Sequence, residues 1–407
     1  MKMMHIGAIC ALLISGQSAA LAQGSQPPLI TNVTASQQPW PSKIVNISYT
    51  LSDTNSSTDN VWIIVSSDGG NTWTVPAVSF SGTFGLGVPA TSTPTVESVT
   101  WNAGNDGTGN YTTQCRTRVI ACNNGMTLVP SGSFNRGDNL DGESDAPVYS
   151  VYVNAFLMDN NYVSGYLWSA VYNYGTNNGY GFDNAGGYNG LSYPVWGINW
   201  YDAVKWCNAR SQYEGVTPVY YTDPACTQLY TTSDVNSLYL KTNSSGTVVS
   251  GYRLPTEAEW EKAARGGLSG MRFPWGNTVS NYPPASGGLA NYDADTSYSH
   301  DLGPNGFNPA FSTGSQPYTS PANSFPANGY YLYDMAGNLF CWCSDWYSST
   351  YYASGQINPQ GPSGSCCRAL RGGAWNFSAY YLRCANRFST QPANAFNIIG
   401  LRCVKGF

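Results

Sequence analysis

The chain has 407 residues, 42% of them hydrophobic, which is enough to bury more than one sizeable core and argues against disorder. Only 10% of the residues are charged, the formal net charge is −5, and no run of lysine or arginine occurs. These values exclude the basic surface that nucleic-acid binding requires.

The first 22 residues have the pattern of a secretory signal peptide. Lys2 precedes an apolar run from Ile6 to Ile14, and Ala20-Leu21-Ala22 supplies the small residues of a cleavage site. The run is too short to span a bilayer, which takes about 20 residues, and no later segment is long and charge-free enough. We expect cleavage after Ala22 and an extracellular or cell-surface protein without a membrane span.

Cleavage there limits the chemistry of the mature chain. It removes Cys10 and His5 and leaves His300 as the only histidine. Zinc and non-haem iron sites that need several imidazoles are therefore excluded. The remaining cysteines are even in number, which in an exported chain favours disulfides over metal ligands.

Short β-rich runs follow one another through the first part of the chain at spacings typical of a sandwich. In residues 43–51, Val45, Ile47 and Tyr49 alternate with outward positions, which indicates one buried face. We predict an immunoglobulin- or fibronectin-III-like β-sandwich over residues 23–121 and a second domain over residues 122–407. The expected strands are Leu29–Ala35, Lys43–Leu51, Val61–Ser66, Glu97–Trp101 and Thr113–Ala121.

Residues 66–73 match the pattern S-x-D-x-G-x-T-W, the Asp-box familiar from sialidases. An aspartate that binds turn amides, a glycine with positive φ and a folded tryptophan stabilise a hairpin turn without any chemistry. A single copy, without an arginine cluster for a sialic acid carboxylate, favours this structural interpretation over a glycosidase site.

Helices are expected at three places in the second domain. Thr256 and Glu259 have the spacing of a capping box, and Gly266 follows the last turn of that helix as a residue with positive φ. Apolar residues at helical spacing predict a second helix over Trp200–Ser211, and a third is expected from Ser164 to about Tyr174.

The second domain contains six motifs: Gly125–Phe134, Trp200–Val204, Arg253–Trp260, Phe273–Gly276, Asn328–Asn338 and Leu370–Trp375. Their order resembles that of the formylglycine-generating enzyme, or sulfatase-modifying factor, family, and the resemblance spans about residues 125–407. It implies an α+β variant of the C-type lectin-like fold, with little regular structure and a few helices.

The resemblance fails where the chemistry of that family is located. The active enzymes carry a cysteine pair after a Gly-Gly-Ser/Ala motif, which binds copper(I) and activates oxygen. Here Gly372-Gly373-Ala374 is followed by no cysteine before Cys384, and Phe340 stands at the position of an active-site tryptophan. We therefore expect neither bound copper nor any catalytic residue, and a sulfatase-maturing oxidase is the alternative.

The resemblance also implies a disulfide between Cys207, in the expected second helix, and Cys384, in an Arg-Cys-Ala motif. Cys122 begins the first strand of the domain and Cys403 lies in its last, so these two would cross-link the ends if the strands are neighbours. The other pairings stay open. The candidates are Cys341, Cys343, Cys366 and Cys367, with a thiolate metal site at Cys341-Trp342-Cys343 as the alternative.

Structural calcium is a further implication of the resemblance. The first site would use Asn291 and the carbonyl of Tyr292, with Asp301 as a looser candidate, and the second would use Asp334 and the carbonyls of Gly337 and Leu339. Cys341 replaces a glutamate ligand of the second site, which weakens that expectation because calcium prefers hard oxygen ligands.

The segment between Trp375 and Ile399 carries only two charges, Arg383 and Arg387, among many asparagine, tyrosine, phenylalanine and serine residues. It resembles the variable region of diversity-generating-retroelement target proteins, which display variable side chains on a fixed lectin-like backbone. Such a composition suits a binding surface, although the same residues could line an aromatic core or a vestigial enzyme pocket. The residues expected to contact a ligand are Trp375, Asn376, Phe377, Ser378, Tyr380, Tyr381, Leu382, Phe388, Ser389, Thr390, Asn394, Phe396 and Asn397.

These inferences predict an exported, non-catalytic protein that binds a protein or glycan ligand through residues 375–398. The first alternative is the sulfatase-maturing oxidase. The second is an extracellular structural or adhesive subunit, and self-assembly of the chain is left open.

Overall fold

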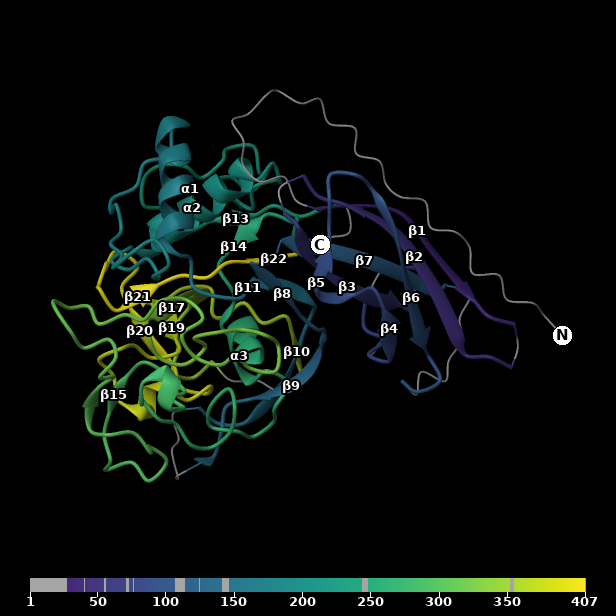
Figure 1. Ribbon diagram of the computed structural model, residues 1–407. Coiled ribbons are helices and arrows are strands. Elements are labelled where there is room, and N and C mark those ends of the chain that lie inside the picture. Colours follow the sequence, from purple (N-terminus) through teal and green to yellow (C-terminus); the bar gives the residue numbers. More distant parts are fainter. Residues whose placement is uncertain are drawn as a thin grey trace. The chain divides into compact units, whose positions relative to one another are not determined.

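The computed structural model describes residues 28–39, 41–54, 56–70, 73–75, 77–106, 114–123, 125–140, 146–243, 248–351 and 355–406. The predicted signal peptide lies outside these residues. The chain divides into two compact units, one ending at Ser131 and the other spanning Gly132–Gly406 (Figure 1). The second unit thus begins ten residues after the predicted start of the second domain at residue 122.

The first unit consists of two antiparallel sheets that share one core. The strand order is β1-β2-β6-β4 in one sheet and β5-β3-β7 in the other. Val45, Ile47 and Tyr49 are buried as their alternation predicts, and they share the core with Val61 and Val65 of the other sheet. The strands are β1 (Leu29–Gln37), β2 (Ile44–Ser52), β3 (Thr58–Ser66), β4 (Phe80–Gly82), β5 (Gly85–Pro89), β6 (Thr95–Asn102), β7 (Arg116–Asn123) and β8 (Met126–Val129).

The described residues of the Asp-box form a turn after β3. The Ser66 hydroxyl donates to Asp68 Oδ1 at 2.7 Å and accepts from the Gly70 amide at 2.9 Å. Gly69 and Gly70 both have positive φ, and the Arg118 guanidinium lies 4.7 Å from the ring centroid of Trp73. These contacts account for the motif structurally.

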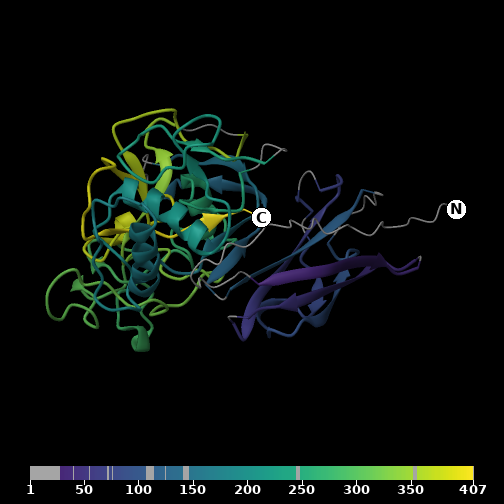
Figure 2. The same ribbon diagram turned by 90° about the horizontal axis from the view of Figure 1, so that it is seen from above.

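The second unit is mostly loop and short strand, with few helices, as Figures 1 and 2 show. Its larger sheets have the orders β18-β10-β9, β14-β22-β11 and β20-β19-β17-β21. The helices are α1 (Gly165–Asn177), α2 (Trp200–Tyr213), α3 (Glu257–Arg265) and the 3-10 turns η2 (Pro284–Ser286) and η3 (Ala379–Leu382). The strands are β9 (Gly132–Arg136), β10 (Tyr149–Val153), β11 (Phe156–Asp159), β12 (Tyr220–Tyr221), β13 (Tyr239–Leu240), β14 (Tyr252–Arg253), β15 (Asp293–Ala294), β16 (Gly306–Phe307), β17 (Phe340–Trp346), β18 (Gln356–Ile357), β19 (Arg368–Arg371), β20 (Phe388–Thr390), β21 (Ile399–Gly400) and β22 (Val404–Lys405).

The capping signals place the helices correctly. The Thr256 hydroxyl accepts from the Glu259 amide, the Glu259 carboxylate accepts from the Thr256 amide, and Gly266 ends α3 at a φ of 56°. The Ser164 hydroxyl caps α1. Within the described residues, no helix is both long and apolar enough to cross a bilayer.

Candidate ligand-binding surface

A buried ionic cluster lies between α3 and the C-terminal part of the chain. The Arg387 guanidinium binds the Glu257 carboxylate through two hydrogen bonds of 2.6 and 2.8 Å, and Arg371 binds Glu261 at 2.6 Å. Burial alone would raise the pKa of both carboxyl groups, but the surrounding guanidinium groups, Arg136 among them, lower each pKa to about 2. Both carboxylates are therefore charged at neutral pH.

Arginines of the C-terminal segment also bind its backbone. Arg371 donates to the carbonyls of Cys384 at 2.9 Å and Ala385 at 3.0 Å. Arg383 donates from Nε to the Tyr380 carbonyl at 3.1 Å and pairs with Asp138 at 3.3 Å. Because these guanidinium groups are buried and bind several acceptors at once, they fix the path of the chain through this region.

The side chains between the arginines have a different environment. We call residues 375–398 the display segment. Asn376, Phe396 and Asn397 are exposed. Half-buried are Phe377, Ser378, Tyr380, Tyr381, Phe388, Ser389, Thr390 and Asn394. Trp375 and Leu382 are buried, so we reassign these two predicted contact residues to the framework that supports the surface.

The half-buried aromatic residues form one cluster, which we call the aromatic platform: Phe377, Tyr380, Tyr381 and Phe388. Phe340 of β17 lies fully buried beneath it, with ring centroids 4.9 Å from Phe377 and 5.0 Å from Phe388. Tyr381 lies 4.9 Å from Phe377 and 5.2 Å from Tyr380. Each platform ring thus packs on one side and stays partly open on the other, which combines core and surface roles.

The predicted disulfide pairings are not formed, and the geometry corrects one of them. Cys207 of α2 faces Cys403, with 3.6 Å between the two sulfur atoms, and not Cys384. Cys384 is buried beside Arg265, and burial raises its pKa to about 12. Cys122 lies near the carbonyls of Asn60 and Met126 in the first unit. The resemblance implied a Cys207–Cys384 pairing, whereas the structure places Cys403 opposite Cys207.

Oxidation of the protein is expected to link Cys207 to Cys403. Small side-chain rotations would close the gap to the ~2 Å of an S–S bond. The cross-link would stabilise the second unit by about 3–5 kcal/mol by constraining the unfolded chain. Non-reducing peptide mapping checks this, and a Cys207–Cys384 peptide or a free Cys207 thiol would contradict it.

Cys341 and Cys343, the alternative thiolate site, lie fully buried in β17. Burial raises the pKa of Cys341 to about 12 and also raises that of Cys343, so burial favours the neutral thiol at both positions. The sulfur atoms of Cys366 and Cys367 lie 2.6 Å apart in the bend just before β19. In the part of the chain that the structure describes, no three histidine, cysteine or carboxylate groups are placed to hold a metal ion.

The candidate calcium ligands are engaged with the protein itself. The Leu339 carbonyl accepts from the Tyr162 hydroxyl, and the Tyr292 carbonyl accepts from the Asn281 amide at 3.3 Å. Asn291 donates its amide to the Tyr318 carbonyl at 2.7 Å. Burial raises the pKa of Asp334 to about 7, and Gly337 packs against the Asn291 carbonyl. Calcium stays a prediction of the resemblance.

Comparison with known proteins identifies the family. The Sulfatase-modifying factor enzyme 1-like domain matches residues 112–407. The chain therefore belongs to this family. The formylglycine-generating enzyme of Thermomonospora curvata is 31% identical over 310 residues, which cover 69% of this chain and 92% of that enzyme. The resemblance predicted from the motifs is thus confirmed.

Other proteins that are similar to this chain differ in length and in name. The serine/threonine-protein kinase pkn1 of Chlamydia caviae is 39% identical over 159 residues, 38% of this chain, which match only 21% of the kinase. The solved structure of Treponema denticola variable protein 1 is similar with a TM-score of 0.52 and 27% identity, over 71% of this chain and 95% of that one.

Sequence reasoning missed the framework role of the buried arginines. Arg371, Arg383 and Arg387 are charges within a segment of otherwise neutral residues. A lone charged residue among apolar neighbours indicates that it has a buried partner of opposite charge. The expected helix around Glu257 carries acidic residues, and these were the candidate partners.

Proposed function

We propose that this chain is a non-catalytic ligand-binding protein. It would use the fold of the sulfatase-modifying factor family as a framework that presents the display segment to a ligand. We further propose that it is exported through residues 1–22 and that the first unit is an immunoglobulin- or fibronectin-III-like spacer. The ligand would be a protein or a glycan on another surface.

One observation carries this proposal. Buried arginines hold the backbone of the display segment, while many of its uncharged side chains, among them Asn376, Tyr380 and Phe396, are at least partly open. A fixed backbone lowers the entropy lost on binding, and tyrosine, phenylalanine and asparagine give contact area and adaptable hydrogen bonds. The likeness to a protein named a variable protein supports the same interpretation.

The family's oxidase chemistry has no support in the display segment. Soft thiolate ligands are what copper(I) requires, and no cysteine lies between Gly373 and Cys384. The neighbouring residues that contact one another are instead Phe340, Phe377 and Phe388, which offer neither a ligand nor a base.

We expect no conversion of cysteine to formylglycine when the purified protein is given copper(I), oxygen and a peptide containing Cys-x-Pro-x-Arg. Mass spectrometry of the peptide is the measurement, with an active formylglycine-generating enzyme as the positive control. Product above the level of a reaction without protein would contradict the proposal and favour the oxidase alternative.

A further inference from the structure

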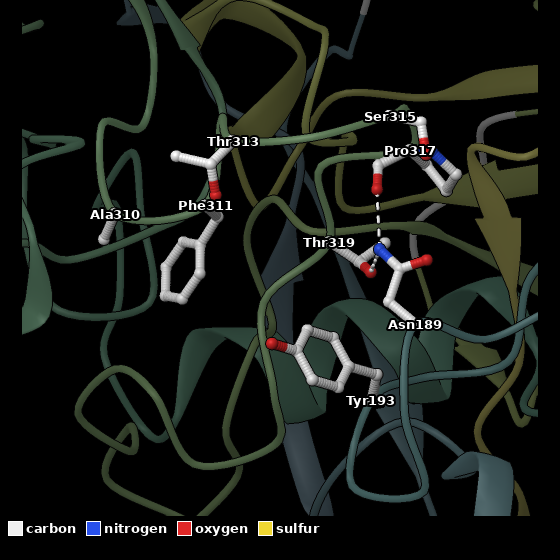
Figure 3. A pocket seen from close by; sticks show the side chains of 8 residues that line it. All are labelled: Asn189, Tyr193, Ala310, Phe311, Thr313, Ser315, Pro317 and Thr319. Atoms are coloured by element: carbon white, nitrogen blue, oxygen red, sulfur yellow. Dashed lines mark hydrogen bonds between the residues drawn. The ribbon is translucent and has the colours of Figure 1, made fainter.

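A hollow of about 340 Å³ lies in the second unit between two loops (Figure 3). One loop contributes Asn189 and Tyr193, and the other contributes residues from Ala310 to Thr319. Figure 3 shows the rings of Tyr193 and Phe311 and the amide of Asn189 around this hollow. Its volume is at the lower end of the range for small-ligand sites, about 300–1,000 Å³.

The two loops are tied together, so the hollow is preformed. Asn189 donates its side-chain amide to the Pro317 carbonyl at 2.7 Å and to the Thr319 hydroxyl at 3.1 Å, as the dashed lines in Figure 3 mark. The Ala322 amide also donates to the Ser192 carbonyl at 2.9 Å. A ligand would therefore not have to order these loops when it binds.

The residues that line the hollow favour an uncharged ligand with several hydroxyl groups. None of the lining residues is an acid, lysine, arginine or histidine. The hydroxyls of Tyr193, Thr313 and Ser315 have no hydrogen-bond partner among the described residues, so they remain available to donate and accept. The rings of Tyr193 and Phe311 also line the hollow, and its exposed lining is mostly polar. A sugar offers the matching surface, since its edge carries several hydroxyl groups.

The hollow also adjoins the display segment. The ring of Tyr318, between Pro317 and Thr319, packs at 5.3 Å against Trp375 at the start of that segment. The Gly197 amide, four residues after Tyr193, donates to the Phe396 carbonyl at 3.2 Å near its end. Both walls of the hollow are thus continuous with the framework that supports the display segment.

We propose that this hollow binds one neutral sugar residue of a glycan, as a fixed subsite beside the display segment. The proposal rests on the ligand-binding function proposed above and names a ligand class for it. The sugar hydroxyls would bond to Tyr193, Thr313 and Ser315.

Saturation-transfer NMR and calorimetry on the whole mature protein test this with a panel of probes. The neutral probes are methyl glucoside, methyl galactoside, methyl mannoside, N-acetylglucosamine and maltose. A heparin disaccharide and an uncharged hexapeptide serve as probes of other classes. We expect at least one neutral sugar to bind and the other classes not to. Failure of every neutral sugar, or equal binding of the peptide, would overturn the proposal.

Variants locate the binding. Ala310→Trp fills the hollow from its exposed rim and should weaken sugar binding at least ~10-fold, and Tyr193→Phe, which removes one hydroxyl, should weaken it about 5-fold. Tyr166→Phe, on the exposed face of α1, is the matched control and should change nothing. Unaltered sugar binding in both hollow variants would place the sugar elsewhere and refute the subsite.

The same measurements separate this proposal from the proposed function. Phe396→Ser in the display segment should leave binding of a free sugar unchanged. Sugar binding lost only in the hollow variants supports the subsite even if the display segment recognises nothing. Conversely, a display segment that yields binders while no sugar binds refutes the subsite alone.

Discussion

Glu261→Gln is expected to destabilise the second unit by about 3–5 kcal/mol. The Glu261 carboxylate is 1% exposed and pairs with Arg371 at 2.6 Å, Arg265 at 2.8 Å and Arg136 at 3.3 Å. The neutral amide leaves these buried guanidinium groups without their shared anion, and they cannot escape to water.

Chemical denaturation of the variant, followed by tryptophan fluorescence, measures this loss. Asp295→Asn is the matched control because Asp295 is an exposed carboxylate of the same unit. We expect the control to change the unfolding free energy by less than about 0.5 kcal/mol. A Glu261→Gln protein as stable as the control would show that the cluster does not hold the framework.

The same ionic cluster determines how the free energy of unfolding falls at low pH. The pKa of Glu257 and that of Glu261 are each about 2 in the folded protein, below the ~4.3 of an unfolded glutamate. A carboxyl group whose pKa is lower in the folded protein stabilises the fold at pH values above its pKa in the unfolded chain. This stabilisation is lost as the pH falls toward its pKa in the folded protein. Stability should therefore decrease between about pH 4.5 and pH 2, and less steeply in Glu261→Gln.

Trp375→Ala should cost the second unit about 3–5 kcal/mol, as truncation of a large buried aromatic side chain does. Trp375 is 2% exposed and packs against Tyr318 at 5.3 Å and Phe307 at 5.6 Å. Its indole also reaches the Asn397 carbonyl at 3.4 Å. Loss of this side chain would release both ends of the display segment.

Phe396→Ala is the matched control for this variant. Phe396 belongs to the same segment but is 49% exposed, so its truncation should lower the melting temperature by no more than about 2 °C. Equal melting temperatures of the two variants would contradict the assignment of Trp375 to the framework.

Much of the fold could be predicted from the sequence because local signals were strong. The alternation of Val45, Ile47 and Tyr49 gave the buried face of β2, and the Thr256–Glu259 capping box placed the start of α3. Strands β4 and β5 were missed because they are short and contain glycine, so their pairing depends on neighbouring strands and not on their own composition.

The site was harder to predict because its organisation is tertiary. Composition indicated a binding surface at residues 375–398, but nothing local distinguishes buried Trp375 from exposed Phe396. The partner of Arg387 is Glu257, 130 residues away in the sequence. The Cys207–Cys403 approach likewise depends on how β22 and the residues before it return to α2, which spacing along the chain does not encode.

The central claim is that a fixed framework presents exchangeable side chains for recognition. The most direct test is a library randomised at Asn376, Ser378, Tyr380, Ser389, Asn394, Phe396 and Asn397 and selected against hen egg-white lysozyme as an arbitrary target. A control library is randomised on the exposed face of α1, at Tyr166, Asn173, Thr176 and Asn177.

We predict that the display library yields lysozyme binders with Kd values of about 1 µM or below, and that their melting temperatures stay within about 5 °C of the parent protein. The α1 library should yield none. Display variants that fail to fold, or that bind no better than the α1 variants, would contradict the claim that residues 375–398 form a recognition surface.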